Sequence, residues 1–213
     1  ALKEGVDDKR LLRYPSGANI DAITPQSKSE CRALLDIDEP GPFLVYVANY
    51  NPDERFFLKA LARVFERNRR VTLISAAPPF TDSIVREYGL RDRIIGLGRR
   101  PFEQMKIVLG AGDVTMLPLD DNISNRGRWP NKFGDYLAAG RPIATNAIGD
   151  VADYFPAQGE RGDIGAAAPC DADAYGDAVV RLLERDSDWE AMGRAARRLA
   201  ETRLCWANLA VEV

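Results

Sequence analysis

Short apolar runs alternate with segments of helical periodicity along most of the chain. Six runs read as strands, at residues 43–48, 71–75, 93–97, 114–117, 142–145 and 164–167. Helical patterns are predicted at residues 28–35, 52–65, 81–88, 102–109, 130–139, 172–184 and 189–201. This alternation is typical of βαβ units, whose right-handed crossovers build a parallel sheet. We therefore predict an α/β fold, an open, doubly wound, Rossmann-like sheet of about six parallel strands with helices on both faces.

The length and composition fit one sizeable domain. The chain has 213 residues, of which 46% are hydrophobic, enough for an ordinary core. We expect a single Rossmann-like domain over residues 1–213, with a turn-rich lead-in at 1–40, the sheet and its crossovers at 41–185, and C-terminal helices at 186–213. The chain begins with Ala1 rather than methionine, which suggests processing or a fragment of a longer protein, and we favour the fragment.

Charge and cysteine usage exclude several classes of function. The formal net charge is −3, whereas nucleic-acid-binding domains usually carry a basic face, so no nucleic-acid partner is expected. The chain has no histidine, which excludes Ser-His and Cys-His catalysis. Its three cysteines are too far apart in sequence for a zinc site, and no metal site is predicted. Their odd number fits a reducing compartment, and no apolar run approaches the roughly eighteen residues of a membrane span, so we predict a cytoplasmic location.

A cluster of cations precedes the helix predicted at 130–139. Arg126, Arg128 and Lys132 lie at or just before its start, and Pro130 suits the first helical position. Unpaired N–H groups and a partial positive charge at a helix start disfavour cations there, and a bound phosphate would reverse that penalty. The alternative is a solvated surface cluster in which Asp120, Asp121 or Asp135 neutralises the cations.

The loops that follow the strands are the expected ligand-binding edge, since ligands of open α/β sheets bind beyond the carboxyl ends of the strands. Cations recur there, in residues 49–55, 98–101 and 118–128. Neither the G-x-G-x-x-G dinucleotide fingerprint nor the G-x-x-x-x-G-K-[ST] phosphate loop is present. The anion site is therefore assigned to the fourth crossover, before residue 130.

Five stretches match a set of motifs in a fixed order. Residues 13–21 are similar to "P-N-G-x-D", residues 47–55 to "V-G-R-x-x-x-x-K" and residues 97–101 to "L-G-x-x-P". Residues 111–118 are similar to "A-D-x-x-x-L-P", and residues 132–143 to "E-x-x-A-x-G-x-P-V". Together they resemble the nucleotide-binding C-terminal domain of GT-B glycosyltransferases, in the retaining group that carries the E-x7-E motif. This resemblance implies one half of a GT-B fold, and a sugar transferred from a nucleotide-sugar donor.

The resemblance implies a role for each matching residue. Asp135 takes the place of the second motif glutamate, which holds the ribose hydroxyls, and a carboxylate can accept two such hydrogen bonds. Arg55 replaces a lysine that stabilises the leaving diphosphate, and Asn49 stands where the family has an arginine with the same task. Gly98, Arg99 and Arg100 would lie along the base.

The same resemblance places the phosphates at the helix start. The backbone N–H groups of Asn131, Lys132 and Phe133 would meet a phosphate, and the Lys132 ammonium would add a charge. Arg55 and Lys132 are thus the expected catalytic residues. Arg126, Gly127, Arg128 and Pro130 complete the expected donor site.

Two departures from the family leave the chemistry open. The first motif glutamate, a carboxylate that handles the donor sugar in the family, falls on Gly127, and Asn49 carries no charge. Arg126, Arg128 and Lys132 could supply the missing positive charge, which stabilises a leaving diphosphate electrostatically. Alternatively, this is a divergent branch with another donor geometry, or catalysis has been lost and nucleotide binding kept.

Several side chains have structural explanations as well. Arg99 and Arg100 could be solvated loop charges, and Trp129 could either stack on a base or sugar or pack beside the helix start. Asp150 is predicted to cap a short helix at 151–154, after Gly149, a glycine that the family also has. Phe133, Tyr136 and Leu137 are predicted to be core by their spacing.

The expected whole protein is a hexosyltransferase-type enzyme. A missing N-terminal domain would supply the acceptor, a glycan or lipid, so this chain alone should bind the donor weakly and turn over little. No cofactor is expected besides the nucleotide-sugar substrate, and peripheral membrane association is left open. The alternatives are a non-catalytic nucleotide or phosphosugar-binding module, and an NAD-dependent oxidoreductase, which lacks the glycine fingerprint and a histidine.

Overall fold

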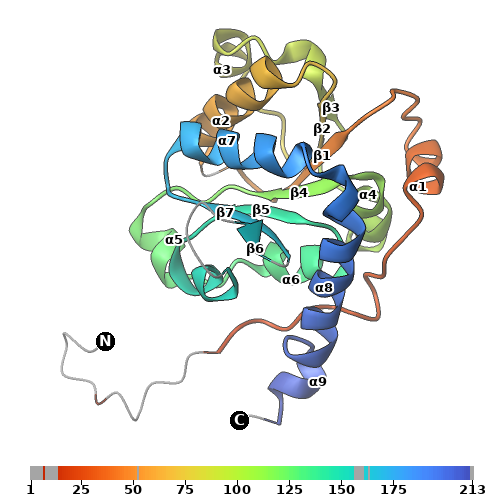
Figure 1. Cartoon of the computed structure of the whole chain (residues 1–213), viewed down its shortest axis with the longest axis vertical. Helices are drawn as coiled ribbons and strands as arrows, with labels where there is room; N and C mark the ends of the chain where they lie inside the picture. The colour runs from red at the N-terminus through yellow and green to blue at the C-terminus, as the bar shows by residue number, and fades with distance from the viewer. Residues whose placement is uncertain (1–6, 8–13, 52, 156–160, 163, 212–213) are drawn as a thin grey trace.

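The protein is an α/β domain built on a single twisted sheet (Figure 1). The computed structural model describes residue 7 and the ranges 14–51, 53–155, 161–162 and 164–211. The start of the predicted lead-in, including Arg13 of the first motif stretch, lies outside these residues, as does residue 52, the predicted start of the helix at 52–65.

The sheet has seven strands in the order β3-β2-β1-β4-β5-β7-β6. The strands are β1 (Phe43–Val47), β2 (Thr72–Ala76), β3 (Ile94–Gly96), β4 (Val114–Leu117), β5 (Ile143–Asn146), β6 (Arg161–Gly162) and β7 (Gly165–Ala168). All neighbours pair in parallel except β6, which pairs antiparallel with β7. The prediction of about six parallel strands is confirmed. The two-residue β6 was missed because it is too short to show periodicity.

Helices cover both faces of the sheet (Figure 1). The α-helices are α1 (Lys28–Leu34), α2 (Glu54–Arg67), α3 (Asp82–Glu87), α4 (Met105–Ala111), α5 (Ile123–Gly127), α6 (Asn131–Ala138), α7 (Ala172–Leu183), α8 (Trp189–Thr202) and α9 (Trp206–Leu209). Shorter 3₁₀ segments are η3 (Arg91–Arg93), η4 (Phe102–Gln104), η5 (Gly149–Tyr154) and η6 (Asp186–Asp188). The predicted helix at 102–109 is therefore η4 followed by α4, and α5 and α9 were not predicted.

The expected start of α6 needs one correction. Pro130 is not the first helical residue but the N-cap, with an extended backbone (φ −81°, ψ 103°), and the helix begins at Asn131. The Pro130 carbonyl accepts the N–H of Phe133 at 2.8 Å, as an N-cap carbonyl does.

Alternate residues of the central strands pack into two separate cores. Phe43, Val45 and Val47 of β1 belong to the cluster that includes buried residues of α4, α6 and α8. Leu44 and Tyr46 belong to the other cluster, with buried residues of α2 and α7. A strand buried on both faces reads as a continuous apolar run, which explains why β1 was recognisable in the sequence.

The strand order of the sheet reverses between β1 and β4. Their pairing ends at Leu44–Val114 and Val45–Thr115, and beyond it the two strands separate. The Tyr136 hydroxyl of α6 lies between the two strands here. It accepts a hydrogen bond from the Val47 N–H at 3.1 Å and can donate one to the Met116 carbonyl at 3.2 Å. Burial raises the pKa of Tyr136, so the group stays a neutral hydroxyl. Phe133, Tyr136 and Leu137 are fully buried, as predicted.

The described part of the lead-in is held against α6 and α8. The Arg197 guanidinium donates to the carbonyls of Ile20 (3.0 Å), Ile23 (2.8 Å) and Ala138 (2.9 Å). Asp113 adds a second clamp: it is bonded to Lys28 at 2.5 Å and to Arg32 at 2.8 Å, and so ties α1 to the start of β4. These contacts join residues 18–34 to the sheet domain.

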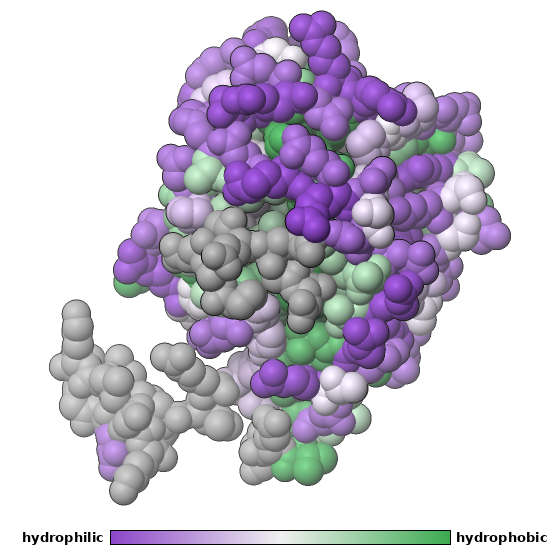
Figure 2. All heavy atoms as spheres, in the orientation of Figure 1, coloured by the Kyte–Doolittle hydropathy of each residue, from purple (hydrophilic) through white to green (hydrophobic). Residues whose placement is uncertain are grey.

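The surface of the face shown in Figure 2 is uneven in polarity. Hydrophilic residues cover its upper part, over α2 and α3, and apolar residues gather at the lower end near α9. Trp206 of α9 is 51% exposed. Within the described residues no helix combines the length and apolar character needed to cross a bilayer.

The Tyr136 hydroxyl is expected to contribute to stability through its two strand contacts. Tyr136→Phe leaves the buried Val47 N–H without its acceptor, so the free energy of unfolding should fall by about 1–3 kcal/mol in denaturant titrations. Tyr14→Phe, at an exposed position, is the control and should change stability by less than about 0.5 kcal/mol. Equal stabilities of the two variants would contradict this role.

Candidate functional site

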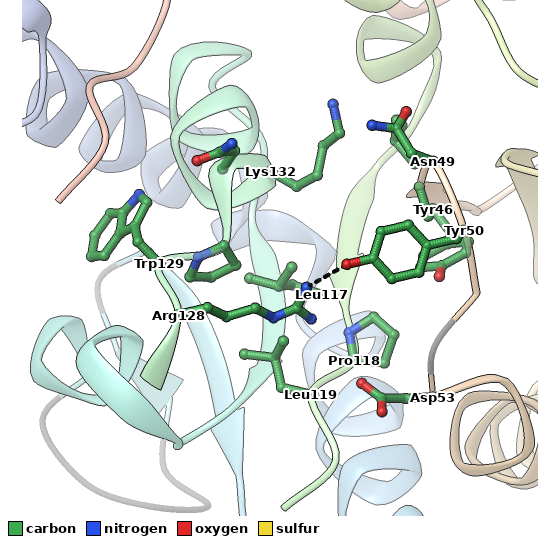
Figure 3. Close-up of a pocket in the computed structure, with 14 residues that line it drawn as sticks. Tyr46, Asn49, Tyr50, Asp53, Leu117, Pro118, Leu119, Arg128, Trp129 and Lys132 are labelled. Atoms are coloured by element: carbon green, nitrogen blue, oxygen red, sulfur yellow. Dashed lines mark hydrogen bonds between the residues drawn. The ribbon is translucent and has the colours of Figure 1, made fainter. Parts of the chain in front are cut away.

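A crevice opens between the carboxyl ends of β1 and β4, where the strand order reverses. Three segments line it: residues 46–50 with Asp53, residues 117–119, and residues 128–132 before and at the start of α6. Figure 3 shows these side chains converging from the two sides of the opening. The crevice occupies the position at which open α/β sheets bind ligands.

The three cations predicted at this site have different partners. Arg126 makes a double hydrogen bond to Asp121 (2.5 and 2.7 Å), which lowers the pKa of the Asp121 carboxyl. Lys132 lies 3.0 Å from Asp135 Oδ2. The alternative that aspartates neutralise the cations thus holds for these two. Lys132 and Arg128 line the crevice, and Arg126 does not.

Arg128 is held by neutral groups. Its Nε and Nη2 donate to Asn125 Oδ1 at 2.9 and 2.6 Å, and its Nη1 lies 3.4 Å from the Tyr50 hydroxyl. Tyr50 reaches toward it across the crevice from the loop after β1 (Figure 3). Among the described residues no carboxylate pairs with Arg128, so a full positive charge faces the crevice.

Asn125 connects Arg128 to a carboxylate. Its Nδ2 donates to Asp53 Oδ2 at 2.9 Å and to the Asp120 carbonyl at 2.7 Å. Asn125 is only 3% exposed. Its backbone N–H donates to the side-chain oxygen of Asn122, the N-cap residue of α5, at 2.9 Å. The short helix α5 therefore fixes an amide that bonds a cation through its oxygen and an anion through its nitrogen.

The start of α6 offers two backbone donors. The Phe133 N–H is already bonded to Pro130, and the Phe133 side chain is fully buried, so Phe133 presents neither group to the crevice. The N–H groups of Asn131 and Lys132 have no acceptor within the described part of the chain, and both residues line the crevice. An anion at this helix start would be bound by these two groups.

Trp129 both lines the crevice and packs against the helix start. Its ring meets Phe133 and Tyr154 edge-on, at centroid distances of 5.7 and 5.8 Å. Its indole N–H is buried and has no acceptor among the described residues. The packing alternative is therefore confirmed, while stacking on a base or sugar is untested.

Some predicted site residues lie outside the crevice. Arg55 is bonded to Glu87 of α3 at 2.7 and 3.0 Å, which raises the pKa of Arg55. Five residues separate it from Asn49, one more than in the motif it was matched to. Asp135 is buried beneath Lys132 with a side chain only 9% exposed.

The loop at 98–101 lies beyond the neighbouring strands. Gly98 has φ +67°, a left-handed conformation that favours glycine, and it lines a separate hollow with Ser75, Gly96 and other residues beyond β2 and β3. Arg99 reaches back and donates to the Asn49 carbonyl at 2.6 Å. Arg100 is exposed. The structure thus brings Asn49 and Arg99 together but leaves Arg99 and Arg100 outside the crevice lining.

Gly127 lines an adjoining hollow rather than the crevice itself. That hollow is formed by Tyr50, Asp53, residues 122–125, Gly127 and Arg128. A Cβ atom added at Gly127 would meet nothing within 4 Å. A longer side chain at this position would therefore project into open space.

Several residues of this site were not predicted from the sequence, namely Tyr46, Tyr50, Asp53 and Asn125. The signal for Asp53 and Tyr50 was their place in the loop after the first strand, the same loop from which Asn49 was chosen. Asn125 could have been found only with α5, whose polar sequence shows no helical periodicity.

The prediction for Asp150 was wrong. The 3₁₀ segment η5 begins at Gly149 with Ile148 as its N-cap, so Asp150 lies inside the first turn. Gly149 has φ +57°, and a Cβ there would lie 2.9 Å from the Asn125 carbonyl and 3.2 Å from that of Arg126. This glycine lets η5 pack closely against the backbone of α5 and so helps to hold Asn125 in position.

Gly149→Ala should therefore cost more stability than the same change at Gly89. Gly89 also has a positive φ (+65°), but a Cβ there meets nothing within 4 Å. Gly89→Ala should cost about 1–2 kcal/mol for the backbone conformation alone. Gly149→Ala should cost roughly 1 kcal/mol more in denaturant unfolding, because the new methyl group crowds α5. Equal losses would show that η5 does not support α5 closely.

No group of three or more candidate metal-ligating side chains occurs among the residues that the structure describes. Two of the three free cysteines, Cys31 and Cys205, are buried, and Cys170 is half-buried. Burial raises the pKa of the Cys31 and Cys170 thiols, which favours the unreactive protonated form.

The fold has solved counterparts among glycosyltransferases. Anabaena HepE, solved with UDP and glucose, superposes with a TM-score of 0.78 at 15% identity, over 99% of this chain and 57% of that protein. Sucrose-phosphate synthase from Thermosynechococcus elongatus has a TM-score of 0.72 at 19% identity, over 93% of this chain and 49% of that one. This chain thus spans about half the length of these two proteins.

A third structure corresponds to the chain as a separate domain. It is the C-terminal domain of a group 1 glycosyl transferase protein (LpcC) from Francisella tularensis, with a TM-score of 0.68 at 12% identity, over 89% of this chain and 100% of that domain. The predicted fold, the C-terminal half of a GT-B enzyme, is thereby confirmed.

The sequence comparisons agree with the fold. No curated protein matches the chain significantly. The family model "Glycosyl transferases group 1" matches residues 41–185, more than half of the chain. The chain therefore belongs to the group 1 glycosyl transferase family.

Proposed function

We propose that this chain is the donor-binding domain of a glycosyltransferase and that the crevice between β1 and β4 binds a nucleoside diphosphate sugar. The observation that carries the proposal is the convergence there of Arg128, Lys132 and the two unpaired N–H groups of α6. Such a set of donors suits a diphosphate, and the family membership supplies the class of reaction.

The charges assign different tasks to the two cations. Arg128 has only neutral partners, so it can pair with a phosphate without breaking an existing ion pair. Lys132 already forms an ion pair with Asp135, and this buried carboxylate orients the Lys132 ammonium at the crevice. In the reaction, both cations would stabilise the negative charge that develops on the leaving diphosphate. Asp135, matched to the motif glutamate that holds the ribose hydroxyls, does not line the crevice, so its part in this proposal is to orient Lys132.

The acceptor and the complete activity belong to a longer protein in this proposal. HepE, which resembles this chain, was solved with UDP and with UDP-glucose. We infer that the whole protein transfers a hexose from such a donor to a glycan, lipid or other acceptor. The chain alone is expected to bind the donor and turn over little, because a GT-B enzyme works between two domains.

A second candidate is a nucleotide or phosphosugar-binding module without catalysis. It is favoured by Gly127, which provides no carboxylate, and by Asn49, which brings no charge to the crevice. The two candidates share the binding site and differ only in transfer, so binding is the property to establish first.

Isothermal titration calorimetry of the chain with UDP, GDP, ADP and NAD tests the site. One nucleoside diphosphate is expected to bind, and Arg128→Ala and Lys132→Ala should each lower its affinity about tenfold, since each removes a charge-assisted hydrogen bond. Lys59→Ala removes the same charge from an exposed pair with Asp173, outside the crevice, and should leave the affinity unchanged. Binding of no nucleotide, or a preference for NAD, would contradict the proposal.

Arg55→Ala decides the role of Arg55. If Arg55 stabilises the diphosphate, as the family resemblance implies, its guanidinium must leave Glu87, and the substitution should weaken nucleoside diphosphate binding by a factor similar to that of Lys132→Ala. An affinity equal to that of the Lys59→Ala control would remove Arg55 from the site. Glu87→Gln, which breaks the same ion pair and keeps Arg55, should not weaken binding.

A further inference from the structure

One carboxylate faces the whole binding region. Asp53 lines both the crevice and the adjoining hollow that contains Gly127, and no other aspartate or glutamate among the described residues lines either of them. Arg128 and Tyr50 also belong to both. The two hollows therefore adjoin and are taken together as the binding region, with Lys132 and Asp53 toward opposite ends in Figure 3.

Among the described residues, the Asp53 carboxylate is bonded only to neutral donors. Its Oδ2 accepts from Asn125 Nδ2 at 2.9 Å and from the Asp120 N–H at 3.4 Å, and its Oδ1 accepts from Asn122 Nδ2 at 3.3 Å. Two carboxylate oxygens can accept about four hydrogen bonds, so these three contacts, two of them long, leave capacity for another donor.

The absence of a cationic partner distinguishes Asp53 from Asp121 and Asp135. Asp121 is paired with Arg126, and Asp135 with Lys132. Within the described residues no lysine or arginine is paired with Asp53. Because uncharged amides hold it in place, its negative charge remains available to the hollow.

The arrangement has opposite character at its two ends. Lys132 and the N–H groups of α6 favour an anion at one end, Arg128 lines both hollows, and the Asp53 carboxylate at the other end would repel an anion. A carboxylate instead binds groups that donate hydrogen bonds, and hydroxyl groups are such donors. The whole region therefore suits a ligand with a phosphate at one end and hydroxyls at the other.

We propose that Asp53 binds hydroxyl groups of the donor's sugar, and so takes over from the loop after β1 the role of the carboxylate that Gly127 does not provide. The inference rests on the proposed function, because it presumes that the diphosphate lies at α6. It identifies Asp53 as a residue that recognises the sugar rather than the nucleotide.

Paired ligands separate this role from a structural one. Calorimetry would compare UDP with UDP-glucose, GDP with GDP-mannose and ADP with ADP-glucose, on the unmodified chain and on Asp53→Asn. For the pair that binds, Asp53→Asn should lower the affinity for the sugar conjugate about tenfold and change that for the free diphosphate by less than about twofold. Asp120→Asn makes the same charge change at a neighbouring side chain outside both hollows, and should affect neither ligand.

A second variant restores a carboxylate from the other wall. Gly127 lines the same hollow and has room for a side chain, so if the carboxylate of Gly127→Glu reaches the sugar, the double variant Asp53→Asn/Gly127→Glu should regain most of the lost affinity for the sugar conjugate. Equal weakening of the free diphosphate and its conjugate by Asp53→Asn would mean that Asp53 only holds α5 in place. That result would overturn the inference and leave the proposed function standing. If no nucleotide binds the unmodified chain, both fail.

Discussion

The binding region depends on how β1 and β4 are held where they separate. Their ladder ends at Val45 and Thr115, and the next polar groups of the two strands would face each other without partners. The Tyr136 hydroxyl satisfies the Val47 N–H and can also bond the Met116 carbonyl, from a helix whose first turn forms the wall of the crevice. One buried hydroxyl thus ties the opening of the sheet to the position of α6. The site is a consequence of the topology, made rigid by that contact.

The opposite wall is built on amides rather than on ion pairs. Asn125 bonds Arg128 through its oxygen and Asp53 through its nitrogen, so it fixes a cation and an anion without letting them neutralise each other. A direct Arg128–Asp53 ion pair would satisfy both groups and leave little charge for a ligand. Neutral hydrogen-bond partners orient Arg128 and Asp53 and leave both charges available to a ligand. This is a form of preorganisation that suits a binding site.

Most of the fold, but less of the site, could be predicted from the sequence. The strands were visible because residues such as Leu44 and Val45 are apolar in succession, and α6 because Phe133, Tyr136 and Leu137 repeat at helical spacing. The polar helix α5 has no such pattern, and it is stabilised by an Asn122 cap and by contacts with Asp53 from a distant loop. Residues whose position is set by long-range hydrogen bonds leave no local signal. Asn125 was missed for this reason. Asp53 lies in the loop from which Asn49 was chosen, but nothing local pointed to its contacts with α5.

The position of Asp53 also bears on what the loss of a motif residue means. A glycine at 127 looks like the loss of a functional group when the sequence is read one motif at a time. In the folded chain the relevant quantity is the charge facing the hollow, and the loop after β1 supplies a carboxylate to the same space. A hydroxyl group of a ligand interacts with the carboxylate and not with the segment that carries it. The same chemistry can therefore persist when its side chain moves from α5 to the facing loop, provided that neutral amides such as Asn125 keep the carboxylate unpaired.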